Sequence, residues 1–221
     1  MPYRRTANVV RRLAAREDAI LDAASAVAAE GGMNAVQIVP VAHRAGIAAG
    51  TVYRYFPSKT DLVAELVASV ATREIAAMQA AANAAPGPLS ALTGAVATFA
   101  SRALSERRLA WAAIAEPVES HLDAVRLDFR KALAGELETR IKAAMSAGYL
   151  PDQDARLAAT AIVGALLEAL IGPLAPDLAG DAASVRTAVQ NATLLALRAV
   201  GMVDARARGL VAQIVLLSEK A

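Results

Sequence analysis

The chain is 221 residues long and carries 23 lysine and arginine residues against 21 aspartate and glutamate residues, a formal net charge of +2. It has no cysteine and two histidines, which excludes disulfides, thiolate zinc sites and cysteine nucleophiles and argues against a metal site. A chain of this length can bury a substantial core, and its alanine-rich, aromatic-poor composition favours close-packed helices over sheets. We expect no cofactor and no bound metal.

The positive charge is concentrated in the first part of the chain. Residues 1–60 hold eight basic residues against four acidic ones, whereas residues 61–221 hold fifteen against seventeen. A basic surface attracts phosphate whatever the base sequence, and a slightly acidic remainder is kept away from it. Arg4, Arg5, Arg11 and Arg12 form either an arm that follows a DNA groove or a solvated tail, and their charge alone does not decide between the two.

The sequence gives no sign of export or of membrane insertion. The basic start is followed by no apolar segment before Arg11, so it does not resemble a secretory signal, and we expect a cytoplasmic protein. Residues 157–174 approach the length of a membrane span but contain Thr160, Glu168 and Pro173. We interpret this segment as a buried packing helix and expect no membrane partner.

The N-terminal third predicts three helices. Apolar residues at helical spacing indicate a first helix over residues 8–30, with a basic N-terminal end that frays, and a second, short helix over 36–45. Gly31 and Gly32 end the first helix, and a Gly-containing turn separates the second from a third over 48–56, which Pro57 stops. Two short helices joined by a tight turn are typical of a helix-turn-helix.

The remainder predicts further helices and no repeat. Ser58 and Asp61 form a capping box that opens a long helix reaching to about residue 82, and the Ala85–Pro88 segment breaks the chain before the next. The helices expected after this break cover residues 89–103, 109–115, 118–147, 151–172, 181–200 and 204–217.

The segments Ala42–Ile47 and Gly50–Lys59 resemble the DNA-binding domain of TetR-family (tetracycline-repressor-like) bacterial transcriptional regulators. The resemblance covers about residues 15–65 and implies an all-α fold. In that fold a three-helix, N-terminal helix-turn-helix DNA-binding domain (residues 1–57) precedes a larger C-terminal helical domain (58–221) for ligand binding and dimerisation. It also implies a regulator without enzymatic activity, most often a repressor, that binds a double-stranded DNA operator as a homodimer and is released by a small-molecule effector.

The third helix is expected to carry sequence recognition, because the second helix of a helix-turn-helix enters the major groove. Arg54 can reach a guanine edge or a phosphate, and Lys59 can bind a phosphate beside helix N-terminal amides. Candidate DNA-binding residues are Gln37, Arg44, Ala48, Ala49, Gly50, Thr51, Tyr53, Arg54, Tyr55 and Lys59. Two assignments stay open: Tyr55 either contacts phosphate or stacks in the core with Phe56, and Arg44 either contacts DNA or is solvated or ion-paired.

The sequence departs from the family pattern in its recognition segment. Ala48 stands where a Ser or Thr usually caps the helix, and Ala49 where a Lys is common. Val39 and Pro40 replace residues that are often Arg and Asp. Because fewer polar side chains remain to read bases, we expect specificity to depend in part on DNA shape.

The resemblance implies an effector pocket between the helices of the second domain. Candidate lining residues are Met78, Phe99, Trp111, Glu116, His121, Phe129 and Met145. The large apolar residues among them are also compatible with ordinary core. The apolar composition favours a hydrophobic or amphipathic effector. A different hypothesis treats Glu116, Glu119 and His121 as the acid–base cluster of a helical enzyme, although no second histidine lies nearby to support a metal.

The segments at about residues 153–171 and 182–200 are apolar around much of their circumference. A helix of this kind has to be covered on nearly all sides, so we expect these two to pair with their copies in a homodimer. A dimer would read two half-sites about one helical turn, or multiples, apart. A non-specific architectural DNA-binding protein is a third hypothesis, and it predicts binding without sequence preference.

Overall fold

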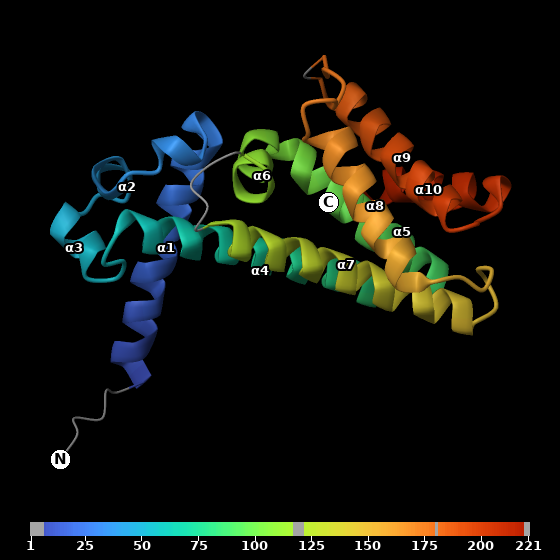
Figure 1. Cartoon of the computed structure of the whole chain (residues 1–221), viewed down its shortest axis with the longest axis horizontal. Coiled ribbons are helices and arrows are strands. Elements are labelled where there is room, and N and C mark those ends of the chain that lie inside the picture. Colours follow the sequence, from blue (N-terminus) through green and yellow to red (C-terminus); the bar gives the residue numbers. More distant parts are fainter. Residues whose placement is uncertain (1–6, 117–121, 180, 219–221) are drawn as a thin grey trace.

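The computed structural model describes residues 7–116, 122–179 and 181–218, and their side chains over 11–116, 122–179 and 181–213. Within these ranges the chain is helical and has no strand, which confirms the expected all-α class (Figure 1). The helices are α1 (Ala7–Gly31), the short 3₁₀ helix η1 (Met33–Ala35), α2 (Ile38–Arg44), α3 (Ala49–Tyr53), α4 (Lys59–Asn83), α5 (Pro88–Ser105), α6 (Arg107–Ile114), α7 (Asp123–Ser146), α8 (Ala155–Leu170), α9 (Ala182–Ala199) and α10 (Asp204–Ser218).

The helices α1 to α3 form a small N-terminal domain, called the head here, at one end of the molecule (Figure 1). Ile20 of α1, Val41 of α2 and Val52 of α3 are completely buried and form its core with Phe56, which is 3% exposed. Gly46 turns the chain between α2 and α3 with a φ of 65°, a conformation that side chains with a Cβ rarely adopt. The head is therefore a helix-turn-helix packed on α1, as the sequence predicts.

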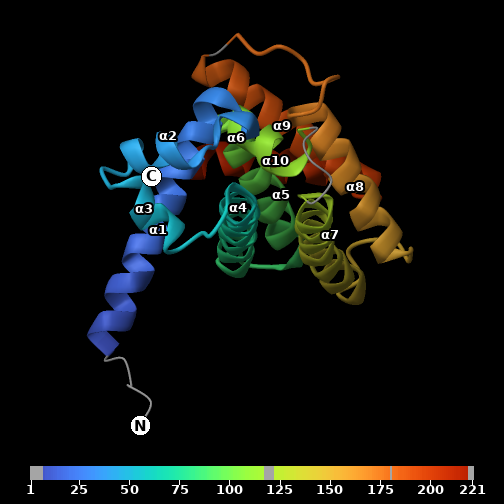
Figure 2. The ribbon, with the colours of Figure 1, turned by 60° about the vertical axis from the view of Figure 1, so that its left-hand side comes forward.

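The first helix is longer than its core requires. Both views show the N-terminal half of α1 extending away from the rest of the molecule (Figures 1 and 2). Arg11 and Arg12 lie within this helical extension and are exposed, so the described part of the expected basic arm is helical and not frayed. Alanine-rich sequence favours helix even where tertiary packing is absent, which explains the difference. Arg4 and Arg5 lie outside the described residues.

The long helix α4 connects the head to the second domain. The Ser58 hydroxyl accepts a hydrogen bond from the Asp61 N–H at 3.1 Å and donates one to the Asp61 carboxylate at 2.7 Å. The Ser58 side chain thus caps α4 at the predicted start of the helix, and the Asp61 carboxylate binds the capping hydroxyl. Val63, Leu66 and Val67, in the first turns of α4, are buried, so the connection between the domains is a packed helix and not a flexible linker.

The second domain is a bundle with α4, α5 and α7 side by side (Figures 1 and 2). Five residues recur at helical spacing along one face of α5, and all are buried: Leu89, Leu92, Val96, Phe99 and Ala103. The helix α9 packs on α5, and α8 packs on α7 and α9, at the end of the molecule away from α2 and α3. The structure thus has the predicted small N-terminal domain and larger helical second domain.

Several predicted helix ends need correction. The recognition helix was expected over 48–56, but regular α-helix covers only Ala49–Tyr53. Pro57 has no N–H to continue the helical hydrogen bonds, and the residues just before it form a turn. The second helix begins at Ile38 instead of 36, because η1 occupies the preceding residues. The eighth begins after Asp154, whose carboxylate caps it by accepting from the Arg156 and Leu157 N–H groups, and not at Pro151.

The start of the helix predicted over 118–147 is also different. Described helix begins at Asp123, and residues 118–121 lie outside the described residues. Its inward face is as predicted, since Phe129, Leu133, Leu137 and Ile141 are buried. Over the ranges that the structure describes, no helix combines the length and the apolar character needed to cross a membrane.

Candidate DNA-binding surface and effector cavity

The recognition helix presents a short exposed face. Val52 is completely buried and fixes α3 on the head, while Ala48 and Gly50 are exposed, Tyr53 is 53% exposed and Arg54 follows at the exposed end of the helix. An added Cβ at Gly50 would meet no atom within 4 Å, so the glycine is not required by packing within the chain. Its lack of a side chain leaves the backbone of α3 open to close approach by another molecule.

The start of α3 lacks a side-chain cap. Ala48 occupies the N-cap position with φ −71° and ψ 144° and makes no side-chain hydrogen bond. The amides of the first turn therefore have no side-chain partner at this end. A helix start of this kind leaves N–H groups available for an external acceptor such as a phosphate oxygen.

The start of α4 adds a cation to the same surface. Lys59 is the first residue of α4, half-buried, and lies in the turn where the helix dipole favours a negative charge. Asp61 is the only acidic residue in that first turn, and its carboxylate accepts the Ser58 hydroxyl. The Lys59 ammonium is thus the positive group on this turn that an anion would meet.

The structure also places the five other candidate DNA-binding residues. Gln37 is exposed at the N-cap of α2, and its Nε2 donates to the Asn34 carbonyl at 3.0 Å. Arg44 forms an ion pair with Glu30, Nη1 to Oε1 2.6 Å, on the exposed surface, which is the alternative that the sequence left open. Tyr55 is half-buried against the hydrophobic core, so its ring contributes to packing while part of it stays accessible. Thr51 and Ala49 are half-buried on α3.

The second domain contains an enclosed apolar cavity. Its volume is about 10 Å³, no more than the room of one water molecule. The cavity is lined by side chains of α4, α5, α7 and α8: Met78, Val96, Phe99, Leu133, Leu137, Val163 and Leu166. Any ligand would have to move these side chains, and it would meet only apolar groups.

Only part of the predicted effector set lines this cavity. Met78 and Phe99 do, whereas Trp111, Glu116, Phe129 and Met145 do not. Trp111 is half-buried on α6, and the Glu116 carboxylate accepts a hydrogen bond from the head, so neither belongs to the same region as Phe99. His121 and Glu119 lie outside the described residues. Over the described ranges, no group of three or more His, Asp or Glu residues could hold a metal.

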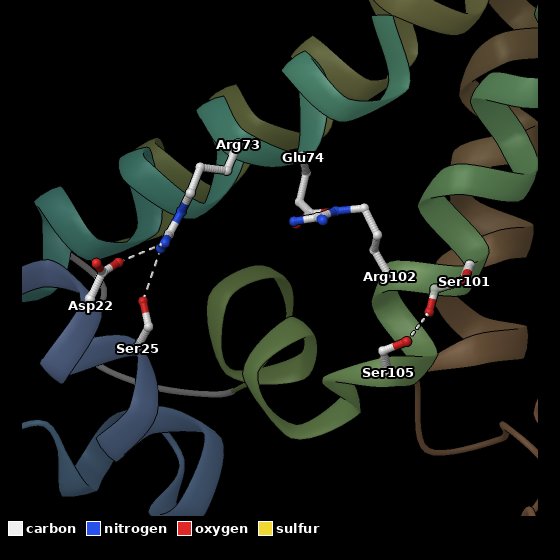
Figure 3. A network of polar contacts seen from close by, with 7 residues as sticks. All are labelled: Asp22, Ser25, Arg73, Glu74, Ser101, Arg102 and Ser105. Atoms are coloured by element: carbon white, nitrogen blue, oxygen red, sulfur yellow. Dashed lines mark hydrogen bonds and ion pairs between the residues drawn. The ribbon is translucent and has the colours of Figure 1, made fainter. Parts of the chain in front are cut away.

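Polar contacts fasten the head to the second domain on two sides. From α4, Arg73 donates through Nη1 to Asp22 Oδ1 and through Nη2 to Ser25 Oγ on α1, each at 3.0 Å (Figure 3). Beside it, Arg102 of α5 donates to both oxygens of Glu74 at 2.8 and 2.7 Å, and these hydrogen bonds raise the pKa of Arg102. On the other side, Glu116 Oε2 accepts from the Met33 N–H at 2.7 Å.

The contacts between the head and the second domain were not predicted from the sequence. Arg73 and Asp22 are separated by 51 residues, and Glu116 and Met33 by 83. A charged side chain on a helix surface is equally stable in water, so its presence does not indicate a partner. Its position in the sequence carries no information about a residue tens of positions away. The deeper lining of the cavity by α8, through Val163 and Leu166, was missed for the same reason.

Comparison with known proteins gives matches to both domains. Residues 20–66 match the family model of "Bacterial regulatory proteins, tetR family". A segment of 48 residues is 56% identical to the HTH-type transcriptional repressor KstR of Mycolicibacterium smegmatis. It covers 22% of this chain and 24% of that repressor, so the chain matches only about a quarter of the relative's length.

Similar solved structures cover most of the chain. The fatty acid degradation regulator FadR from Bacillus halodurans is 27% identical, with a TM-score of 0.67 over 80% of this chain and 97% of that one. The FadR of Bacillus subtilis, solved in complex with stearoyl-CoA, shares the fold at 21% identity, with a TM-score of 0.67 over 84% of this chain and 98% of that one. The helix-turn-helix head thus matches the tetR family of bacterial regulatory proteins, and the whole chain shares its fold with these solved regulators.

Proposed function

We propose that this protein is a DNA-binding transcriptional repressor. The observation that carries the proposal is the head itself: an exposed α3 face with Gly50, Tyr53 and Arg54, within residues 20–66, which match the family model of bacterial regulatory proteins. The helix α3 would enter the major groove, where Arg54 can donate to a guanine edge and Thr51 can meet a thymine methyl group.

Phosphate contacts around α3 would set the register of the head on DNA. Lys59 at the start of α4 and the uncapped amides at the start of α3 offer positive charge and N–H donors. Tyr53 adds an exposed hydroxyl and ring. Arg44 can join them only by leaving or sharing its ion pair with Glu30, which costs little at an exposed position.

The proposed active form is a homodimer through α8 and α9. These two helices pack together and leave Leu157 of α8 67% exposed and Leu195 of α9 52% exposed. Between them α8 exposes Ala161, Gly164 and Ala165, side chains small enough for a second helix to approach closely. A two-fold dimer would present two heads to the half-sites of a palindromic operator.

The proposed effector is a small hydrophobic or amphipathic molecule. Support comes from the apolar cavity between α4, α5, α7 and α8 and from the Bacillus subtilis FadR, which was solved with stearoyl-CoA. Because the cavity has room for no more than about one water molecule, binding of such an effector would displace the helices that line it. A displacement of α4 or α7 would change the separation of the two heads and release the operator.

The experiment that tests the repressor proposal is the selection of bound duplexes from a random DNA pool by the purified protein at near-physiological salt. Enrichment of one palindrome with half-sites near a helical-turn spacing is the expected result. Binding without enrichment would instead support a non-specific architectural protein and reject the proposal.

Replacing Arg54 by alanine should weaken operator binding by about 1–3 kcal/mol and relax the preference at one base position, because a bidentate base contact is lost. Affinities for the selected operator and for its single-base variants, measured by fluorescence anisotropy, check this result. Equal losses on operator and random DNA would reassign Arg54 to the DNA backbone.

Replacing Lys59 by alanine should weaken binding to every duplex alike, because a phosphate contact carries no sequence information. The slope of log K against log salt should decrease by about one unit for each head, which is about two units for the dimer. The matched control is Lys131→Ala on α7, which removes an exposed lysine of the second domain that pairs with Asp128 and should leave the slope unchanged. A Lys59→Ala slope identical to that of the parent would contradict the assignment.

A further inference from the structure

The Glu116 carboxylate is packed against the corner where α1 turns into η1. One oxygen, Oε2, accepts the Met33 N–H at 2.7 Å, and the other, Oε1, lies where a Cβ on Gly32 would come within 2.8 Å of it. Gly32 has a φ of 75°, so glycine serves here both for the turn and for the approach of the carboxylate. A charge-assisted hydrogen bond to a backbone N–H fixes the corner more firmly than a contact between two mobile side chains.

The segment that carries Glu116 is itself held by Arg126 of α7. Arg126 is 4% exposed, and its Nη2 donates to the Ala112 carbonyl at 2.6 Å while its Nη1 donates to the Glu116 carbonyl. These carbonyls belong to the C-terminal end of α6, where a cation is favourable and backbone acceptors lack helix partners. Burial lowers the pKa of Arg126, and its Nε has no partner among the described residues. Burial of the guanidinium costs desolvation free energy, and its hydrogen bonds to two backbone carbonyls offset part of that cost.

The same face of α7 reaches the apolar cavity. Leu133 and Leu137 line the cavity and follow Arg126 by seven and eleven residues, a spacing that puts all three on one side of the helix. The helix α6, whose end Arg126 holds, packs against α1 of the head. A continuous set of contacts therefore runs from the cavity along α7 to Arg126, the end of α6, Glu116 and the head.

We propose that Glu116 is the positioning residue of the DNA-binding head. Arg126 holds the Glu116 backbone just after α6. The Glu116 carboxylate fixes the α1–η1 corner and transmits a displacement of α7 to the head. This inference deepens the proposed function and rests on it. The contact of Arg73 with Asp22 plays a smaller part, because both side chains are largely exposed, at 42% and 69%, and exposed ion pairs contribute little.

The test measures the position of the head directly. Because the chain has no cysteine, Val39→Cys on α2 and Ala143→Cys on α7, both exposed positions, give two unique sites for nitroxide spin labels. Doubly labelled chains mixed with unlabelled chains in large excess report distances within one chain, read by pulsed electron–electron double resonance. The variants compared are Glu116→Ala, Glu116→Gln and Arg126→Met, with the fold of each checked by circular dichroism.

Glu116→Ala and Arg126→Met are expected to broaden the distance distribution. Glu116→Gln should restore the parent distribution, because its amide oxygen can still accept the Met33 N–H. The matched control is Glu138→Ala, which removes a carboxylate of α7 that pairs with Lys142 in the same helix and should change nothing. A parent-like distribution for Glu116→Ala, no rescue by Glu116→Gln, or equal broadening in Glu138→Ala each overturns the proposal.

A second measurement separates this inference from the proposed function. Affinity of Glu116→Ala for the selected palindrome should fall about tenfold, since the two heads lose their fixed separation, while its affinity for random duplex at low salt stays at the parent value. If the parent selects no palindrome, the proposed function fails and the spin-label distances still decide the role of Glu116. If the parent selects one and Glu116→Ala binds it as tightly with an unchanged distance distribution, only the inference fails.

Discussion

A Gly164→Arg variant is expected to be a folded monomer that has lost at least about a hundredfold in operator affinity. Two heads bound on one operator gain affinity by effective concentration, and separating the protomers removes that gain. An added Cβ at Gly164 meets no atom within 4 Å in its own chain, so a larger side chain on this face of α8 should not disturb the protomer. Arginine also favours helix over glycine, so the protomer should be no less stable.

The control is a second exposed glycine in a long helix. Gly135 of α7 likewise has no atom within 4 Å of an added Cβ, so Gly135→Arg makes the same change on another face of the molecule. Sedimentation velocity gives the oligomeric state of both variants, and anisotropy on the selected operator gives their affinities. Gly135→Arg should remain a dimer with parent affinity. A dimeric Gly164→Arg would contradict the use of the α8–α9 face.

Helix ends with strong local chemistry were predictable from the sequence. These ends depend on residues within a few positions of one another. Examples are the Ser58–Asp61 contact at the start of α4 and the Asp181 carboxylate, which accepts from the Ser184 N–H at the start of α9. Glycines with positive φ lie at positions 32, 46, 148 and 201. Apolar spacing gave the buried faces of α5 and α7 for the same reason. The starts of α2 and α8 were predicted too early. The short helix η1 precedes α2, and Asp154 caps α8, whereas the prediction began the latter helix at Pro151.

The head could be predicted in more detail than the second domain. A helix-turn-helix needs particular residues at particular spacings, so the segment around Gly46 and Tyr53 carries a recognisable pattern, whereas Leu or Phe suits almost any position in a helical bundle. Trp111 and Phe129 are as large and apolar as the residues that line the cavity, yet only the packing of α4, α5, α7 and α8 selects Met78 and Phe99. Contacts such as Glu116 to Met33 depend on the relative placement of two domains, which local sequence does not encode.

Replacing Phe99 by alanine should lower the free energy of unfolding by about 3–5 kcal/mol, the usual cost of removing a buried aromatic ring. Phe99 is 3% exposed and adjoins the existing cavity, so the space left by the ring would join it and remain dry and apolar. Benzene should therefore bind the variant and raise its melting temperature, while the parent, with a cavity of about 10 Å³, should not respond. Urea denaturation and thermal scans with and without benzene give both results.

The comparison with Phe56→Ala decides whether this region is suited to a ligand. Phe56 has the same exposure, 3%, but lies at the end of the head beside the turn into α4, where the chain can relax into the space. Phe56→Ala should lose a comparable free energy of unfolding, and benzene should raise its melting temperature little. An equal rise in melting temperature for both variants would remove the argument for an effector site at the cavity. If the cavity is that site, benzene should also weaken operator binding by Phe99→Ala, because the occupied space moves Leu133 and Leu137 and, through α7, the end of α6 that holds the head.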